Sequence, residues 1–247
     1  MGSPKGGIDE GGSITTFKYN SVSSRWDPYG SIIKGLARQA AGYSISLSGN
    51  GSIMAVGFPK AAGLGGTINA GKVAVYFVIG SEWQRFGQEV YGEAEGDGCG
   101  TSVATSQGGN QLVIGSKGGR CSVYRFQSSH WEFQYSIVGA APEDRLGSSV
   151  AVSSDGNVVA CGGFRGVNSN STTSGVVRLW NRATMQESII WPREEVTDAA
   201  SRAPFGASLS MSTDGEYIIV SVPTESNANV GGISASSGTV QIFRLNS

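Results

Sequence analysis

Charged side chains are scarce in this sequence of 247 residues. They make up 15% of it, and 18 basic against 19 acidic residues leave a net charge of −1. Nucleic-acid binding and polybasic membrane anchoring both need a concentrated positive field, so the composition predicts neither a nucleic-acid partner nor a membrane-bound one. No apolar run reaches the roughly 18 residues that a membrane-spanning helix requires, which argues against membrane insertion.

Histidine and cysteine are also rare. His130 is the single histidine, which excludes a zinc site built from several imidazoles, and no nucleophile-elbow motif suggests a Ser-His-Asp triad. Three cysteines, an odd number, do not form a disulfide framework. Cys121 and Cys161 fill positions that valine or isoleucine occupies elsewhere in the chain, which predicts buried thiols, whereas Cys99 has no assignment. The sequence thus predicts no cofactor and no catalytic residue.

Glycine, by contrast, is abundant and falls at repeated positions. In four copies of one pattern, a glycine opens a strand whose alternate residues are small, and a turn ending in glycine leads to a second, apolar strand. The first strands span 42–48, 100–106, 147–153 and 206–212, and the turns contain Asn50-Gly51, Gly108-Gly109, Asp155-Gly156 and Asp214-Gly215. These dipeptides predict two-residue hairpins of type I′.

Two further strands complete the repeat, and we name the four strands a to d. Strand c begins with a glycine followed by apolar or β-branched residues at alternate positions and an aromatic at the fifth; its five copies start at Gly12, Gly71, Gly119, Gly175 and Gly238. Strand d opens with Trp26, Trp83 or Trp131, while the copy at 186–192 has Trp191 at its other end. A tryptophan repeated in one position is more typical of packing than of ligand binding.

Four antiparallel strands in about 50 residues predict an all-β fold, a β-propeller of four-stranded blades. The small face of strand a predicts close approach of a neighbouring sheet. The chain holds four a–b repeats and an N-terminal half-repeat, so four to five blade positions are filled. Strand d at 25–34 could pair with the last strand c at 238–245 and close the ring; alternatively the chain is part of a larger ring, or another subunit supplies strands. We expect residues 1–11 to be a flexible leader and residues 12–247 to be one propeller domain.

Three motifs resemble the FG-GAP repeats of integrin-type β-propellers. They are Phe205-Gly206 at the start of strand a, Gly57-Phe58-Pro59 at the end of strand b, and the Gly-x-Val-x-Val-Tyr form of strand c at 71–76. The resemblance covers nearly the whole chain from residue 12 and implies a propeller of repeated blades. Blades of that family often bind calcium through a D-x-D-x-D-G loop, which this sequence lacks, so the resemblance implies no metal site here.

Acidic residues gather in the segments that join strand d to the next strand a. In a blade, these d–a linkers and the b–c loops emerge on the same face, which would collect Glu93, Glu95, Asp97, Glu143, Asp144, Glu194, Glu195 and Asp198. Such carboxylates could hold Ca²⁺ or act as the acid–base pair of a glycosidase. They could equally be solvated linkers, with Asp97 and Asp144 capping their own loops, since both lie three residues before a strand-a glycine.

The repeats differ most in the length of the b–c loop. It is long at 58–70, 164–174 and 223–237 and short at 117–119, and loops on a rigid scaffold are where recognition usually resides. We therefore expect a non-enzymatic protein-interaction or structural module, a scaffold that binds a protein partner or copies of itself. A carbohydrate-binding propeller and a glycoside-processing enzyme are the alternatives. Asn170 is the better of two glycosylation sequons if the protein is secreted, and the compartment is left open.

Overall fold

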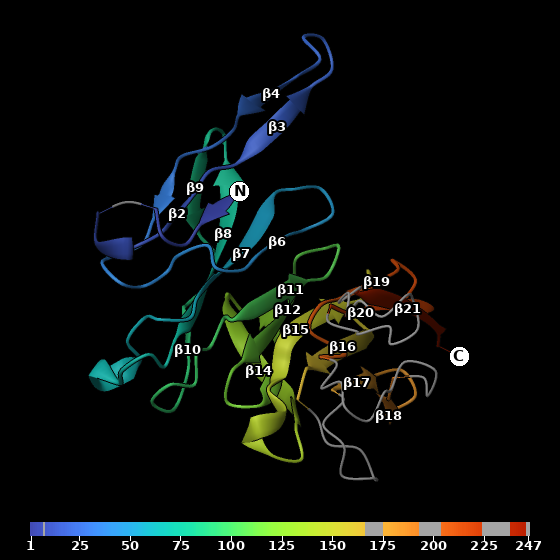
Figure 1. The fold of residues 1–247 in the computed structure, drawn as a ribbon. Helices are drawn as coiled ribbons and strands as arrows, with labels where there is room; N and C mark the ends of the chain where they lie inside the picture. Colours follow the sequence, from blue (N-terminus) through green and yellow to red (C-terminus); the bar gives the residue numbers. More distant parts are fainter. Residues whose placement is uncertain (7, 166–174, 193–203, 224–237, 246–247) are drawn as a thin grey trace, which may run out of the picture. The chain divides into compact units, whose positions relative to one another are not determined.

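The computed structural model describes residues 1–6, 8–165, 175–192, 204–223 and 238–245. Within these ranges the chain forms 21 β-strands and three short 3-10 helices, and none of its helices is long and apolar enough to cross a membrane (Figure 1). The chain divides into two compact units, residues 1–112 with 124–133 and residues 113–123 with 134–247. The all-β prediction is confirmed.

The first unit begins with a small sheet of order β1-β2-β5 and a separate hairpin β3-β4. Their bounds are β1 (Gly2–Ser3), β2 (Ser13–Ile14), β3 (Phe17–Asn20), β4 (Arg25–Pro28) and β5 (Ile33–Lys34), with the 3-10 helix η1 (Ile8–Glu10) between β1 and β2. Strand d at 25–34 is thus β4 and β5, which pair with β3 and β2 of the same half-repeat. The pairing of 25–34 with 238–245 that would close the ring stays a prediction.

The second sheet has the order β10-β8-β7-β6, and β9 also pairs with β8. Its strands are β6 (Ile45–Leu47), β7 (Ile53–Phe58), β8 (Lys72–Ile79), β9 (Glu82–Arg85) and β10 (Val90–Tyr91), with the 3-10 helix η2 (Leu64–Gly66) in the b–c loop. Strand a of the repeat is β6, strand b is β7 and strand c is β8. Strand d is divided into β9 and β10.

Two further sheets are four-stranded and antiparallel in simple sequence order. The third contains β11 (Ser102–Thr105), β12 (Gln111–Ser116), β13 (Arg120–Gln127) and β14 (His130–Val138). The fourth contains β15 (Leu146–Val152), β16 (Val158–Gly163), β17 (Val176–Asn181) and β18 (Gln186–Ile190), and the 3-10 helix η3 (Pro142–Asp144) precedes it. The last sheet contains β19 (Leu209–Met211), β20 (Tyr217–Val222) and β21 (Thr239–Arg244). The predicted order of strands a to d is confirmed in these sheets.

Apolar side chains from adjacent sheets form the core of each unit. In the first unit Ile14 and Ala41 pack with residues of the second sheet such as Met54. In the second unit Phe205 and Ile218 pack with residues of the fourth sheet such as Leu179. Each of these sheets hides apolar side chains from water by packing on the next, so contact between sheets contributes hydrophobic stabilisation.

The small face of strand a allows the backbones of neighbouring sheets to meet, as predicted. Ser44 Oγ donates a hydrogen bond to the carbonyl of Gly100 at 2.8 Å, and Ser149 Oγ donates to the carbonyl of Gly206 at 2.7 Å. A Cβ atom on Gly57, the glycine that ends strand b, would lie 2.1 Å from the same Gly100 oxygen. Gly162 is in the same position against Gly206, at 2.2 Å. Larger side chains at these sites would force the sheets apart.

The a–b turns are not of the predicted type I′. In each, the glycine amide donates to the carbonyl three residues earlier, as in Gly51 to Ser48 at 2.8 Å. Only that glycine has a positive φ, +71° at Gly51, whereas type I′ needs two such residues. The Asn50 side chain stabilises the longer loop instead, accepting hydrogen bonds from Ser48 Oγ and the amide of Ser52, both at 3.0 Å. The same arrangement recurs around Asp155 and Asp214.

The prediction of two buried thiols at Cys121 and Cys161 is wrong in its chemistry. Both side chains are fully buried, but they are joined in a disulfide with a Cα–Cα distance of 6.3 Å. Cys121 is on β13 and Cys161 on β16, so the bond links two adjacent sheets. Their repeat positions are those where apolar side chains of neighbouring sheets meet, which places the two sulfur atoms together. Cys99 is the third cysteine; it is buried and takes the position before the strand-a glycine that Ala41, Leu146 and Phe205 take in other repeats.

Residues 1–11 include β1, whose Gly2 and Ser3 are paired with Ile14 and Ser13. The N-terminal amine also donates to the carbonyl of Thr15 at 2.7 Å. The division into a leader and a single propeller domain stays a prediction.

Candidate binding face

The b–c loop and the d–a linker of the second sheet lie together, as the sequence predicts. The amide of Gly96 donates to the carbonyl of Ile68 at 3.0 Å, and that of Gly98 donates to Asn69 at 3.1 Å. In the fourth sheet, the amide of Arg165 donates to the carbonyl of Asp144 at 3.2 Å. We call the end of each sheet where these segments meet the loop face.

Asp97 and Asp144 cap their own linkers. Both are nearly buried, and Oδ2 of Asp144 accepts a hydrogen bond from the amide of Ala141 at 3.0 Å. Oδ2 of Asp97 accepts one from the amide of Glu93 at 3.3 Å. The side chains of Glu93, Glu95 and Glu143 are exposed, while Glu194, Glu195, Asp198 and Asn170 lie outside the described residues. Within the described part of the chain, no three carboxylate, cysteine or histidine side chains gather as metal ligands would.

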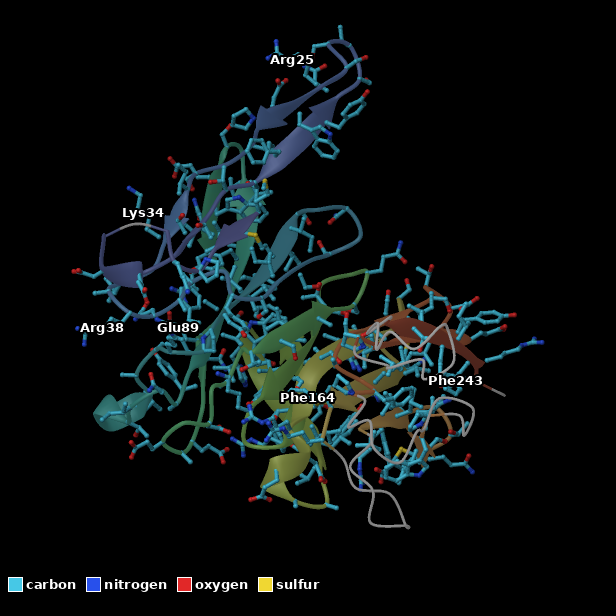
Figure 2. The ribbon with its side chains drawn as sticks, viewed as in Figure 1. Arg25, Lys34, Arg38, Glu89, Phe164 and Phe243 are labelled. Carbon is cyan, nitrogen blue, oxygen red and sulfur yellow. A yellow bond between two sulfur atoms is a disulfide. The ribbon has the colours of Figure 1, made fainter. Side chains whose placement is uncertain are left out.

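Two basic groups of the second sheet converge on Glu89, which the sequence analysis missed. Lys72 Nζ lies 3.0 Å and an Arg85 nitrogen 2.5 Å from Oε1 of Glu89, and the Tyr91 hydroxyl donates to its other oxygen. Glu89 is labelled in Figure 2. Partial burial acts to raise the pKa of Glu89, but the hydrogen bonds from Tyr91, Lys72 and Arg85 outweigh it and lower the pKa to about 2. A carboxylate this acidic stays ionised at neutral pH and cannot serve as a general acid.

Aromatic rings surround this cluster. Lys72 Nζ lies 5.2 Å from the centroid of the Phe58 ring, and the guanidinium of Arg85 lies 4.9 Å from that of Tyr76. The side chains come from the end of β7, from β8 and from strand d. No sequence motif marks the cluster, because its members become neighbours only through the pairing of these strands.

A second arrangement of cations on an aromatic ring is at the loop face of the fourth sheet, around Phe164. Phe164 is labelled in Figure 2. The guanidinium carbons of Arg145 and Arg165 lie 5.7 Å and 5.9 Å from the centroid of the Phe164 ring. Phe164 follows directly after β16, and Arg145 precedes β15. The sequence analysis did not identify this cluster.

His130 is exposed at the start of β14. Its Nε2 lies 3.2 Å from a carboxylate oxygen of Glu132, and Nδ1 lies 3.2 Å from the carbonyl of Ser128. Neither contact places a serine hydroxyl against the imidazole, so this histidine does not have the geometry of a hydrolase triad.

Two of the repeated tryptophans contact an adjacent segment of the first unit, as expected for packing residues. Trp83 Nε1 donates to Thr16 Oγ1, and Trp131 Nε1 donates to the carbonyl of Phe86, each at 2.9 Å. Both indoles are buried, at 8% and 2% exposure. Trp26 occupies the same position in the half-repeat but is 68% exposed.

The comparisons with known proteins bear on the fold. No family model and no curated protein matches the sequence. A solved structure described as a putative 6-phosphogluconolactonase from Bacteroides uniformis matches with a TM-score of 0.58 and 12% identity, over 95% of this chain. The chain spans 61% of that protein's length. At this identity the match shows the fold alone, which is β-propeller-like, with several four-stranded antiparallel sheets like those of a lactonase-type propeller.

Proposed function

We propose that this chain is a non-enzymatic interaction module of the propeller type that binds a protein partner through its loop face. The observation that carries the proposal is the b–c loop of the second sheet, 58–70. Leu64 and Ile68 on this loop are 74% and 62% exposed. Glu93 and Glu95 are exposed on the linker to which the loop is hydrogen-bonded. Two aliphatic side chains beside two carboxylates suit a partner segment that is apolar and basic.

Backbone hydrogen bonds hold this loop in place before any partner arrives. The amide of Gly63 donates to the carbonyl of Thr67 at 2.8 Å, and that of Gly71 donates to Ala61 at 2.9 Å. Ala61 and Ala70 are buried, which anchors both ends of the loop in the core. A preordered loop loses little conformational entropy on binding, so a modest contact area can give useful affinity.

The chemistry of the described residues supports binding over catalysis. The carboxylates of Asp97 and Asp144 are used in loop capping, Glu89 is held by two cations, and His130 has no serine beside it. The resemblance to FG-GAP repeats and the count of four to five blade positions belong to the same proposal.

The test is a double substitution at the tip of the loop, Leu64→Asp with Ile68→Asp. Removal of the loop would also disturb Ala61 and Ala70, so point changes are cleaner. Ile79→Asp is the matched control: Ile79 is 53% exposed and ends β8 at the opposite end of the same sheet. Tagged wild-type and variant chains are compared by quantitative affinity capture, and a partner so found is then purified and titrated directly.

We expect the tip variant to bind the purified partner at least tenfold more weakly than the wild type, and Ile79→Asp to bind it as the wild type does. Both variants should unfold at the same midpoint as the wild type. Equal binding by all three chains would refute a role for this loop. Turnover of a lactone or glycoside by the purified chain would refute the non-enzymatic part of the proposal, whatever the binding result.

A further inference from the structure

The two cation–aromatic clusters differ in one respect, the presence of an internal anion. At the second sheet Lys72 and Arg85 share the carboxylate of Glu89, at 3.0 Å and 2.5 Å. At the fourth sheet Arg145 and Arg165 flank Phe164, and no carboxylate of the described chain is paired with either guanidinium. Other arginines of the same unit are paired, Arg178 with Glu187 at 2.8 Å and Arg244 with Glu216 at 3.7 Å.

The nearest carboxylate by sequence accepts a hydrogen bond within its own linker. Asp144 directly precedes Arg145, but it is only 5% exposed and its Oδ2 accepts from the amide of Ala141. Its carbonyl accepts from the amide of Arg165. Asp144 therefore contacts the Arg165 segment through its backbone, and among the residues that the structure describes no carboxylate pairs with Arg145 or Arg165.

Close backbone packing brings the segments of the two arginines together. A Cβ on Gly163 would lie 2.9 Å from the carbonyl oxygen of Asp144 and 3.0 Å from the amide of Leu146. These residues flank Phe164 on one segment and Arg145 on the other. The glycine allows an approach that a side chain would prevent, so the backbone segments that carry the ring and both guanidiniums lie in direct contact.

Arg145 also has an unusual backbone conformation. Its φ is +52°, in the left-handed region that favours glycine, and Gly98 occupies the corresponding position of the preceding repeat at +59°. Ala40 shows the same conformation at +54°. A residue with a side chain is strained there relative to glycine, and because Ala40 shares it, the conformation belongs to this position of the repeat and directs the chain at Arg145.

We propose that Arg145, Phe164 and Arg165 form a binding site for a small ligand that carries a carboxylate or phosphate group. Guanidinium groups present paired N–H donors that match the oxygens of either anion. The face of Phe164 orients the guanidiniums through cation–π attraction and offers an apolar surface to the rest of the ligand. At the second sheet the carboxylate of Glu89 pairs with the two cations. At this site the anionic group of the ligand would take that place. It is independent of the partner-binding loop proposed above.

Three probes distinguish the chemistry of the ligand: benzoate, phenyl phosphate and inorganic phosphate. Each is titrated into the full chain by calorimetry at constant ionic strength, with sodium chloride as the reference salt, and thermal unfolding is measured in parallel. We expect benzoate or phenyl phosphate to bind with a dissociation constant in the millimolar range or below and to raise Tm, because a ligand that binds the folded state stabilises it. Binding of phenyl phosphate but not benzoate assigns a phosphate site, and the reverse assigns a carboxylate site.

The substitutions Arg145→Gln and Arg165→Gln are each expected to weaken binding at least tenfold, and Phe164→Leu to weaken the two aromatic probes more than inorganic phosphate. Arg178→Gln, on the same sheet but paired with Glu187, is the control and should bind as the wild type does. The proposal is overturned if the wild-type chain binds none of the three probes, or if Arg145→Gln and Arg165→Gln bind them unchanged while remaining folded.

Discussion

The indole of Trp83 donates a hydrogen bond from Nε1 to Oγ1 of Thr16 across 67 residues of sequence. The ring packs on Gly30, where a Cβ would lie 2.5 Å from Nε1. The backbone amide of Trp83 donates a hydrogen bond to Ser31 Oγ at 3.1 Å. Trp131 repeats the pattern against Phe86, Gly87 and Gln88. A tryptophan on strand d therefore joins its repeat to the one before it in each of these two pairs.

Removing one of these indoles is expected to destabilise the chain strongly. Trp83→Ala should lower the free energy of unfolding by about 3–5 kcal/mol, because a large buried ring and its hydrogen bond are both lost. Trp26→Ala is the matched control, because Trp26 is an exposed copy of the same repeat position. It should change the free energy of unfolding by less than about 0.5 kcal/mol. Urea unfolding followed by circular dichroism measures both; similar losses would show that Trp26 is also a packing residue.

The close approach of neighbouring sheets predicts an effect for a single methyl group. Gly57→Ala places a Cβ 2.1 Å from the Gly100 carbonyl oxygen, so the β6–β7 edge must move and unfolding should become easier by about 1–3 kcal/mol. Gly108→Ala is the control, since its nearest neighbour would be 3.5 Å away and its φ is not positive. Differential scanning calorimetry of the two variants and the wild type tests the prediction, which fails if Gly57→Ala melts with the wild type.

The disulfide predicts a stability that depends on redox conditions. It closes a loop of 40 residues between Cys121 and Cys161, and the chain-entropy model gives a contribution of about 4 kcal/mol. Urea unfolding with and without a reductant should show a loss of that order, whereas the double variant Cys121→Val with Cys161→Val should show no response to reductant. Quantification of thiols in the denatured, unreduced protein should find one per chain, and three would contradict the disulfide.

The low pKa of Glu89 predicts a loss of stability in acid. Because the folded-state pKa, about 2, lies below the ordinary value of 4.5, the ionised group stabilises the fold fully above about pH 4.5. That contribution is lost as the pH falls from 4.5 toward 2. Glu89→Gln should be less stable than the wild type at neutral pH and should lose less stability over this interval. Glu95 is an exposed carboxylate of the same repeat, so the control variant Glu95→Gln should follow the wild-type curve of stability against pH. If Glu89→Gln followed that curve as well, the cluster would not contribute to stability.

Calcium is expected to leave the stability of the chain unchanged. The two buried linker carboxylates, Asp97 and Asp144, accept hydrogen bonds from backbone amides, and a bound cation would have to replace these contacts. Tm should therefore agree within about 1 °C with millimolar Ca²⁺ and with chelator, because tight binding to the folded state must raise it. A rise of many degrees would show a metal site that the resemblance to FG-GAP repeats did not imply.

The repeats make most of the strand order predictable from sequence. Small residues such as Ser44 and Ser149, and glycines such as Gly57, recur because a backbone must pass close by, and that requirement is visible in every copy. The local turn was misjudged because an Asn-Gly or Asp-Gly pair permits more than one geometry. The choice here depends on the side chain of Ser48 or Ser153. Its hydroxyl oxygen accepts a hydrogen bond from a backbone amide that would bond to a backbone carbonyl in a tighter hairpin.

The candidate sites were less predictable for a different reason. Cys121 and Cys161 each match valine in other repeats, so the repeat pattern hides the fact that the two positions face each other across sheets. The Glu89 and Phe164 clusters unite residues from strand ends and linkers that have no fixed spacing. Such clusters form when the strands pair. The sequence predicts the order of the strands, but it does not predict which side chains then come into contact.

Cys99 makes the closure of its repeat measurable in solution. With the other two cysteines joined, it is the remaining thiol of the chain, it is 4% exposed, and it forms a parallel bridge with Gly71. A thiol reagent can reach its sulfur only when this junction opens, so the rate of labelling without denaturant reports how often the junction opens. The protein thus contains its own probe of local unfolding, at the point where the second sheet leads into the third.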